Sequence, residues 1–288
     1  MSSYRFCRTD DVALLVDALN RCWSPYFPDE PPVTPAAFKR SIRDLQVWCS
    51  SCMVAFSGSD AIGVLIGAKR PSGTLVHKIA VHPDHRRQGH GRHLLTSLGS
   101  KLAILGPPRM VAEVPETLAA ACELFSANAY IQESLLVDYV LEGEAPDARE
   151  VDGRFLIPVT IDDLAANGLL AEGDAQACWG RSVETLTARK DDIVGLAVAS
   201  DERLEAYLLY WKCGVDPDAT AEIASLRSFV DDDGDRLRQL LARLRAQGMC
   251  TFRFPKVHPA EMSAACLEAL GFRPAGAHRL LAARARSA

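Results

Sequence analysis

The two halves of the chain repeat one order of sequence signals, and this repetition constrains the fold more than any other feature. "YRFCRTDDVALL" near the start and "RFLIPVTIDDLAA" at residues 154–166 have the same form: an alternating strand, two aspartates and the beginning of an amphipathic helix. Each half then places a cysteine–tryptophan pair after that region, Cys22 with Trp23 and Cys178 with Trp179. A chain of 288 residues also has the length of two domains of ordinary size. We therefore predict two copies of one mixed α/β unit.

Periodicity and turn signals give the elements of each copy. In the first copy we predict strands at residues 4–8, 53–57, 62–69, 74–82, 110–114 and 131–141, and helices at residues 10–23, 36–45, 91–105 and 117–128. In the second copy we predict strands at residues 193–199, 205–211, 222–230 and 251–255, helices at residues 235–247 and 261–270, and a last strand that ends near residue 283. The polar stretch at residues 142–150 is the predicted linker, so the predicted domains are 1–143 and 151–288.

Composition argues against several classes of partner. The net charge of −5 and the pI of about 5.8 lack the basic excess that nucleic acids or anionic membranes attract. The longest apolar runs, such as residues 61–68, are too short to span a bilayer. Nine cysteines without a secretion signal indicate free thiols, and the lone C-x-x-C of Cys49 and Cys52 lacks the further ligands of a zinc site. We expect a cytoplasmic monomer or homodimer with no metal, nucleic acid or membrane partner.

The stretch "HPDHRRQGHGRHLL" joins a predicted strand to a predicted helix with little bulk and much positive charge. Gly89 and Gly91 remove side chains where a ligand could approach the backbone. The helix that follows directs its free N–H groups and the positive end of its dipole to the same place, and Arg86, Arg87 and Arg92 add charge. We interpret the stretch as a diphosphate-binding loop. From these residues alone, a tight strand–helix turn with solvated arginines is the alternative.

The residues around this loop resemble a known family. "HKIAVHPDHRRQGHGRHLL" is similar to the coenzyme A signature of the GNAT superfamily of N-acetyltransferases: a strand ending in an aliphatic-Val-x-Pro step, then [Arg/Gln]-x-x-Gly-x-[Gly/Ala], then a helix. The resemblance implies two tandem GNAT-like units, each a mixed, mostly antiparallel twisted sheet flanked by helices. It also implies acetyl-CoA as cosubstrate, with the pantetheine arm along the strand and the diphosphate on the loop. The coenzyme-binding residues that it implies are Ile79, Ala80, Val81, Arg86, Arg87, Gln88, Gly89, His90, Gly91 and Arg92.

His77 is the candidate general base. Strand alternation predicts that residues 75, 77, 79 and 81 face one side of the sheet, and an imidazole with an ordinary pKa near 6.5 suits a base at neutral pH. The pattern H-x-[IL]-A-V-H also resembles the arylalkylamine N-acetyltransferases, in which a histidine at this position helps to deprotonate the amine. A histidine satisfied by hydrogen bonds inside the sheet is the alternative. In that case the next candidates are Asp29, Glu30 and Glu113.

The sequence departs from the family pattern where the thiolate usually receives its proton. Phe125 in "ACELFSANAY" holds the place of the family's tyrosine, and Leu118 stands where an asparagine often contacts the coenzyme. Phenylalanine cannot donate a proton. Cys122, Tyr26 or solvent would then do so, unless the thiolate leaves unprotonated; a buried structural Cys122 is the favoured interpretation of that residue. Four further histidines are interpreted as loop and helix surface rather than metal ligands: His82, His85, His90 and His93.

The second half lacks the loop. "VDDDGDRLRQLL" places Asp231, Asp232, Asp233 and Asp235 before the helix, where carboxylates would repel a diphosphate but cap a helix well. We therefore interpret residues 151–288 as a degenerate repeat of the first unit.

The proline-rich stretch "SPYFPDEPPVTP" follows the first helix and is the candidate acceptor site, with an ordinary surface loop as the equal alternative. Trp23, Tyr26 and Phe27 would pack on the acceptor, and Asp29 and Glu30 would hold a cation. We expect an N-acetyltransferase for a primary amine, most simply a small molecule. A protein N-acetyltransferase and a non-catalytic acyl-CoA binder or sensor are the alternatives.

Overall fold

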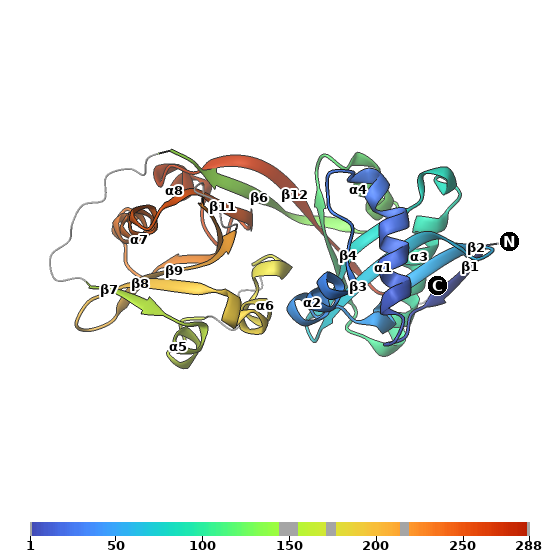
Figure 1. Cartoon of the computed structure of the whole chain (residues 1–288), viewed down its shortest axis with the longest axis horizontal. Helices are drawn as coiled ribbons and strands as arrows, with labels where there is room; N and C mark the ends of the chain where they lie inside the picture. The colour runs from blue at the N-terminus through green and yellow to red at the C-terminus, as the bar shows by residue number, and fades with distance from the viewer. Residues whose placement is uncertain (1, 144–154, 171–176, 214–218, 287–288) are drawn as a thin grey trace. The chain divides into compact units, whose positions relative to one another are not determined.

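The computed structural model describes residues 2–143, 155–170, 177–213 and 219–286, and the chain forms two compact units (Figure 1). Unit 1 consists of Met1–Ser134 with Arg279–Ala288, and unit 2 of Leu135–His278. These units differ from the sequence-based domains because two long strands, β6 (Ile131–Leu141) and β12 (Arg273–Arg284), each contribute residues to both units. The predicted linker lies, from residue 144 on, outside the described residues.

Unit 1 has the strand order β1-β2-β3-β4-β5-β12. Neighbours from β1 to β4 are antiparallel, and β4 runs parallel to β5. The strands are β1 (Ser2–Phe6), β2 (Met53–Ser57), β3 (Asp60–Arg70), β4 (Gly73–Val81) and β5 (Arg109–Pro115). The helices are α1 (Val12–Cys22), α2 (Pro35–Leu45), α3 (His90–Leu105) and α4 (Ala119–Ser126), with short 3-10 helices η1 (Ser24–Tyr26), η2 (Cys49–Ser51) and η3 (Pro83–His85). Cys49 and Cys52 are buried free thiols.

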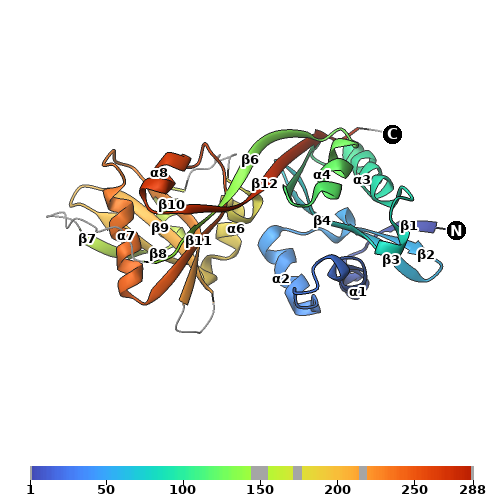
Figure 2. The same ribbon diagram turned by 90° about the horizontal axis from the view of Figure 1, so that it is seen from above.

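The two faces of the unit 1 sheet are covered by different helices. Figure 2 shows α1 and α2 on one face and α3 and α4 on the other. On α3, leucines recur at helical spacing and form one buried stripe: Leu94, Leu95, Leu98 and Leu102. This stripe packs against Leu65 of β3 and Val76 of β4, which fixes the start of α3 close to the end of β4. The helix α2 begins with Pro35, and the side chain of Thr34 caps it by accepting the N–H of Ala37 at 3.1 Å.

Unit 2 repeats this pairing scheme with the strand order β6-β11-β10-β9-β8-β7. Its further strands are β7 (Phe155–Val159), β8 (Val194–Ala199), β9 (Leu204–Cys213), β10 (Ala219–Ser228) and β11 (Met249–Val257). Its helices are α5 (Ile161–Ala166), α6 (Val183–Ala188), α7 (Asp235–Ala246) and α8 (Ala264–Ala269), with 3-10 helices η4 (Trp179–Arg181) and η5 (Lys190–Asp192). Neighbours from β7 to β10 are antiparallel, and β10 runs parallel to β11.

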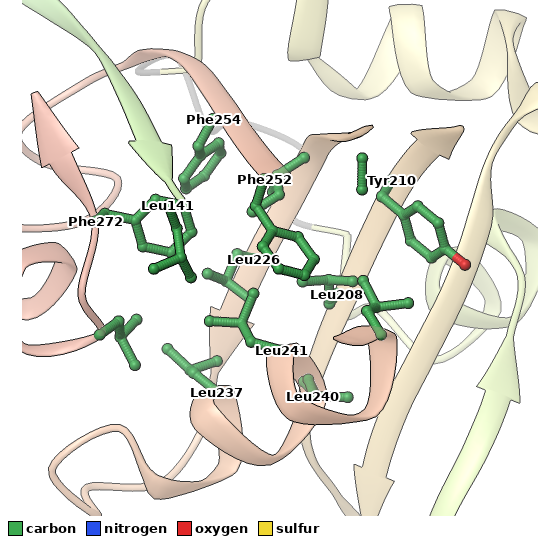
Figure 3. Packing of buried hydrophobic residues seen from close by; sticks show 14 of the residues in the cluster. Leu141, Leu208, Tyr210, Leu226, Leu237, Leu240, Leu241, Phe252, Phe254 and Phe272 are labelled. Carbon is green, nitrogen blue, oxygen red and sulfur yellow. The ribbon is translucent and has the colours of Figure 1, made fainter. Parts of the chain in front are cut away.

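A large hydrophobic cluster of unit 2 lies between α7 and the sheet (Figure 3). Leu237, Leu240 and Leu241 of α7 point toward Leu226 of β10 and Phe252 of β11. Both units therefore bury a leucine-rich helix against one face of the sheet. The predicted fold, two tandem mixed and mostly antiparallel units flanked by helices, is confirmed. In the part of the chain that the structure describes, no helix has the length and apolar character to cross a membrane.

Candidate functional site

The loop between β4 and α3 leaves backbone N–H groups open at the start of a helix. Gly89 is the N-cap of α3 with φ 86°, and a Cβ built on it would have no neighbour within 4 Å. The N–H of His93 donates to the carbonyl of Gly89 at 3.0 Å, so the three preceding N–H groups of the first turn have no helical acceptor. A concave loop of such donors at the positive end of a helix fits an anion.

The two glycines of this loop meet different needs. Gly89 adopts a left-handed conformation that side-chain-bearing residues avoid. At Gly91 a Cβ would lie only 3.1 Å from Cδ2 of Leu124, so the missing side chain lets α3 pack closely on the helix that carries Leu124, α4. Arg87 is also left-handed, with φ 62°, an uncommon state for a residue with a side chain that is often found at functional sites.

The arginines form an exposed positive rim around this loop. Arg86, Arg87 and Arg92 are all exposed, as is Gln88. The guanidinium carbon of Arg86 lies 5.5 Å from the centre of the Tyr26 ring, which holds one arginine against the loop after α1. Exposed guanidinium groups beside open backbone donors suit a phosphate group.

The strands β4 and β5 separate next to this loop. They pair at Thr74 with Met110 and at Leu75 with Val111, and β4 has no further partner on β5 within the described chain. The other edge of β4 stays paired with β3 through Ile79, Ala80 and Val81. The β5-facing edge at these three residues is therefore where an extended ligand arm can lie along the backbone. The hydroxyl of Tyr26 donates to the carbonyl of Val81 at 2.6 Å and occupies one of these groups.

A β-bulge interrupts β4 at His77. Ile66 of β3 pairs with Lys78 and Gly67 pairs with Val76, so His77 is the extra residue of the bulge. The alternation therefore shifts by one position, and Val76, not Leu75, shares a face and a core cluster with Ile79. The prediction that residues 75, 77, 79 and 81 share one face is wrong, because an inserted residue breaks period two. His77 is half-buried on β4, and Glu113 is half-buried on β5 beyond its last pair with β4.

Three of the predicted acceptor residues come together after α1. The rings of Trp23 and Phe27 stack with centroids 4.5 Å apart, and Nε1 of Trp23 donates to Oε2 of Glu30 at 3.1 Å. Asp29 is exposed and forms no ion pair or hydrogen bond among the described residues. The Nζ of Lys78 lies 4.1 Å from the centre of the Trp23 ring and 3.9 Å from Oε2 of Glu30. Sequence reasoning missed Lys78, although a lysine inside the apolar strand "TLVHKIAV" was the available signal.

His90 is buried rather than exposed, which corrects its interpretation as surface. Its exposed fraction is 5%, and its ring lies next to the ring of Tyr4 on β1. Its Nδ1 and the hydroxyl of Tyr4 are hydrogen-bonded at 2.6 Å, while its Nε2 is buried and has no hydrogen-bond partner among the described residues. Burial lowers the pKa of His90 below its ordinary value, and His85 and His93 add to that shift. His93 is exposed and lies against Tyr4, with ring centroids 3.7 Å apart.

The helix α4 offers no tyrosine to the thiolate position. Phe125 is 2% exposed, and its ring meets the Tyr130 ring edge to face at 4.9 Å. Cys122 is buried, and its thiol donates weakly to the carbonyl of Pro115 at 3.8 Å. Among the described residues, no three histidine, cysteine or acidic side chains lie close enough together to hold a metal ion.

Comparison with known proteins agrees with this geometry. Residues 13–129 match the model of the acetyltransferase (GNAT) family. A tandem GNAT protein from the clavulanic acid biosynthesis pathway is 16% identical, with a TM-score of 0.65 and 100% of both chains covered. A GCN5-related N-acetyltransferase from Sphaerobacter thermophilus is 12% identical, with a TM-score of 0.68 over 99% of this chain and 96% of that one. At these identities the structures show a shared fold. No curated protein sequence matches the chain.

Proposed function

Because residues 13–129 belong to the GNAT family of acetyltransferases, we propose that this chain transfers the acetyl group of acetyl-CoA to a primary amine of a small molecule. The observation that carries the proposal is the parting of β4 and β5 beside the open N–H groups of α3. A diphosphate fits the loop residues from Arg87 to Arg92, and the pantetheine arm fits the free edge of β4 at Ile79, Ala80 and Val81.

The chemistry follows from this placement. The amine nitrogen attacks the thioester carbon, an N–C bond forms, the C–S bond breaks and coenzyme A leaves as a thiolate. His77, the extra residue of the bulge on β4, takes the proton that the ammonium must lose. The thiolate takes its proton from Tyr26 or from solvent, since Phe125 has no proton to give.

Acetyl-CoA turnover tests the proposal. The full-length protein is incubated with acetyl-CoA and a panel of amines, and release of the free thiol of coenzyme A is measured. We expect thiol release that depends on one class of amine. A protein that binds acetyl-CoA tightly but releases no thiol with any amine would instead be an acyl-CoA binder or sensor, which is the second candidate that Phe125 favours.

A further inference from the structure

Lys78 has an ammonium group that forms no hydrogen bond within the described chain, although a carboxylate and an aromatic ring lie near it. Lys78 and Ile79 pair with adjacent residues of β3, Ile66 and Leu65. The side chain of Lys78 therefore leaves β4 on the face opposite that of Ile79. The side chain is 23% exposed, and the nearest carboxylate oxygen, Oε2 of Glu30, is 3.9 Å away, beyond hydrogen-bonding distance. An ammonium group has three donors, and none of them finds a hydrogen-bond acceptor among the described residues.

Lys78 also occupies the place expected for a cationic acceptor. An aromatic ring and a carboxylate together form a receptor for a cation, and Trp23 and Glu30 have that arrangement. The cation they hold is the ammonium of Lys78, 4.1 Å from the centre of the indole ring. Burial lowers the pKa of Lys78 below its ordinary value, and the Glu30 carboxylate opposes that shift. A second cation at this place would meet like charge.

We propose that the acceptor carries a carboxylate close to its reacting amine, as an amino acid does, and that Lys78 binds this carboxylate. A carboxylate supplies the acceptors that the three ammonium donors lack, and a charge-assisted hydrogen bond in a half-buried site is stronger than a neutral one. Lys78 follows the candidate base His77 directly and precedes Ile79, where the coenzyme arm begins. An anionic group bound by Lys78 therefore places its own amine beside the parting strands. This inference rests on the proposed function and specifies its substrate class.

The test compares amines with and without the carboxylate. The pairs are L-phenylalanine with 2-phenylethylamine, L-histidine with histamine, and L-lysine with 1,5-diaminopentane, and thiol release gives kcat/KM for each. We expect at least one amino acid to exceed its partner amine by about 10-fold or more. In Lys78→Gln that ratio should fall by about 10- to 100-fold, as expected for a charged hydrogen bond. Lys78→Arg, which keeps the charge, should retain most of the ratio, and this also shows that position 78 tolerates exchange.

A matched control uses the same substitution outside the site. Lys69 pairs with Thr74 at the far end of β4, so Lys69→Gln should leave the ratio unchanged. Equal kcat/KM within every pair, or a ratio that survives in Lys78→Gln, overturns the inference and leaves acetyl transfer standing. If the wild type releases no thiol with any amine, calorimetry with the protein saturated with coenzyme A decides separately. If the amino acid binds more tightly than its partner amine and Lys78→Gln removes that difference, the Lys78 site is supported although the proposed function fails. If the amino acid and its partner amine bind equally, the Lys78 site is overturned.

Discussion

The two units have the same strand pairing and the same bulge, and they differ in what occupies the bulge. In unit 2, Ile223 of β10 pairs with Tyr210 and Ser225 pairs with Leu209, so Ala224 is the extra residue. This is the position that His77 holds on β4. The unit with an open anion loop has an imidazole at the bulge, and the unit without one has a methyl group. The bulge itself is therefore a feature of the fold, and the side chain placed on it distinguishes the two units.

The parting strands differ as well. In unit 2 the parallel pair β10 and β11 stays together through Glu222 and Arg253. Beyond it, the guanidinium of Arg181 donates to the carbonyls of Ala224 on β10 and of Pro255 and Lys256 on β11. Its remaining donors meet the carboxylate of Glu261 at 2.5 and 2.7 Å. All five N–H donors are thus satisfied, and an internal arginine joins β10 to β11 where the corresponding strands of unit 1, β4 and β5, are unpaired.

The N-termini of the helices α3 and α7 also differ. The side chain of Asp232 accepts the N–H groups of Gly234 at 3.2 Å and Arg236 at 2.8 Å, and Arg236 pairs with Glu205 at 2.9 Å. The first turn of α7 therefore has an internal anion where α3 has open donors. In unit 2, internal side chains thus occupy the places where we propose that unit 1 binds its ligand.

The substitution with the largest expected effect gives unit 1 the bulge residue of unit 2. His77→Ala removes the candidate base, so kcat/KM for the preferred amine should fall by about 10²- to 10⁴-fold. Affinity for acetyl-CoA should change little, because the proposed site holds the pantetheine arm through the backbone of β4. Steady-state kinetics and calorimetry measure the two quantities. The control is His258→Ala in unit 2, outside the site, which should keep wild-type turnover. Wild-type kcat/KM in His77→Ala would remove His77 from the mechanism.

The second prediction opens the gap in unit 2. Arg181→Met leaves the Glu261 carboxylate, whose side chain is 15% exposed, without its partner. The free energy of unfolding should fall by about 3–5 kcal/mol, the usual cost of breaking a buried ion pair. Urea denaturation measures it. The double variant Arg181→Met/Glu261→Leu should regain part of the loss because no charge is then stranded. A double variant as unstable as the single one would show that the stranded carboxylate is not the cause.

The third substitution places an acidic side chain in the loop between β4 and α3, as Asp232 is placed before α7 in unit 2. In Gly89→Asp, a carboxylate faces the proposed diphosphate site and a residue with a side chain must adopt a left-handed conformation, so Kd for acetyl-CoA should rise by about 100-fold or more. Calorimetry measures it. Gly234 is the equivalent N-cap of α7, with φ 83°, and Gly234→Asp imposes the same backbone strain in unit 2. Gly234→Asp should keep wild-type affinity for acetyl-CoA. A loss of affinity in Gly234→Asp would indicate that the coenzyme binds unit 2 rather than unit 1.

What the sequence predicts and what it misses have separate physical origins. Local periodicity and turn chemistry predict the repeat, the order of strands and helices and the glycine loop. The structure confirms the fold of two tandem units, while diphosphate binding by the loop stays a prediction. The bulge at His77 could not be predicted, because "TLVHKIAV" contains no turn residue and one inserted position leaves no local signal. The partners of Arg181 lie 43 to 80 positions along the chain. The contact between Lys78 and Trp23 likewise depends on tertiary packing that no local window contains.

The smallest expected effect concerns the first residue of the two helices. His90 begins α3 and is buried, whereas its counterpart in α7 is Asp235, which pairs with Arg238 at 2.7 Å. Because burial holds the pKa of His90 below its ordinary value, the unfolded chain binds that proton more readily than the folded one. The contribution of neutral, buried His90 to the free energy of unfolding is therefore fully present above the ordinary pKa near 6.5. It is lost as the pH falls below that value.

The variant His90→Leu removes this proton uptake. Urea denaturation at pH 7.5 and at pH 5 should show a smaller loss of stability on acidification in the variant than in the wild type. The hydroxyl of Tyr4 also loses its partner in this variant, which lowers stability at both pH values and so does not enter the difference between them. Tyr4→Phe is the matched control, since it removes the same hydrogen bond and keeps the imidazole buried. If Tyr4→Phe flattened the pH dependence as much as His90→Leu does, the hydrogen bond rather than the buried imidazole would link unit 1 to pH.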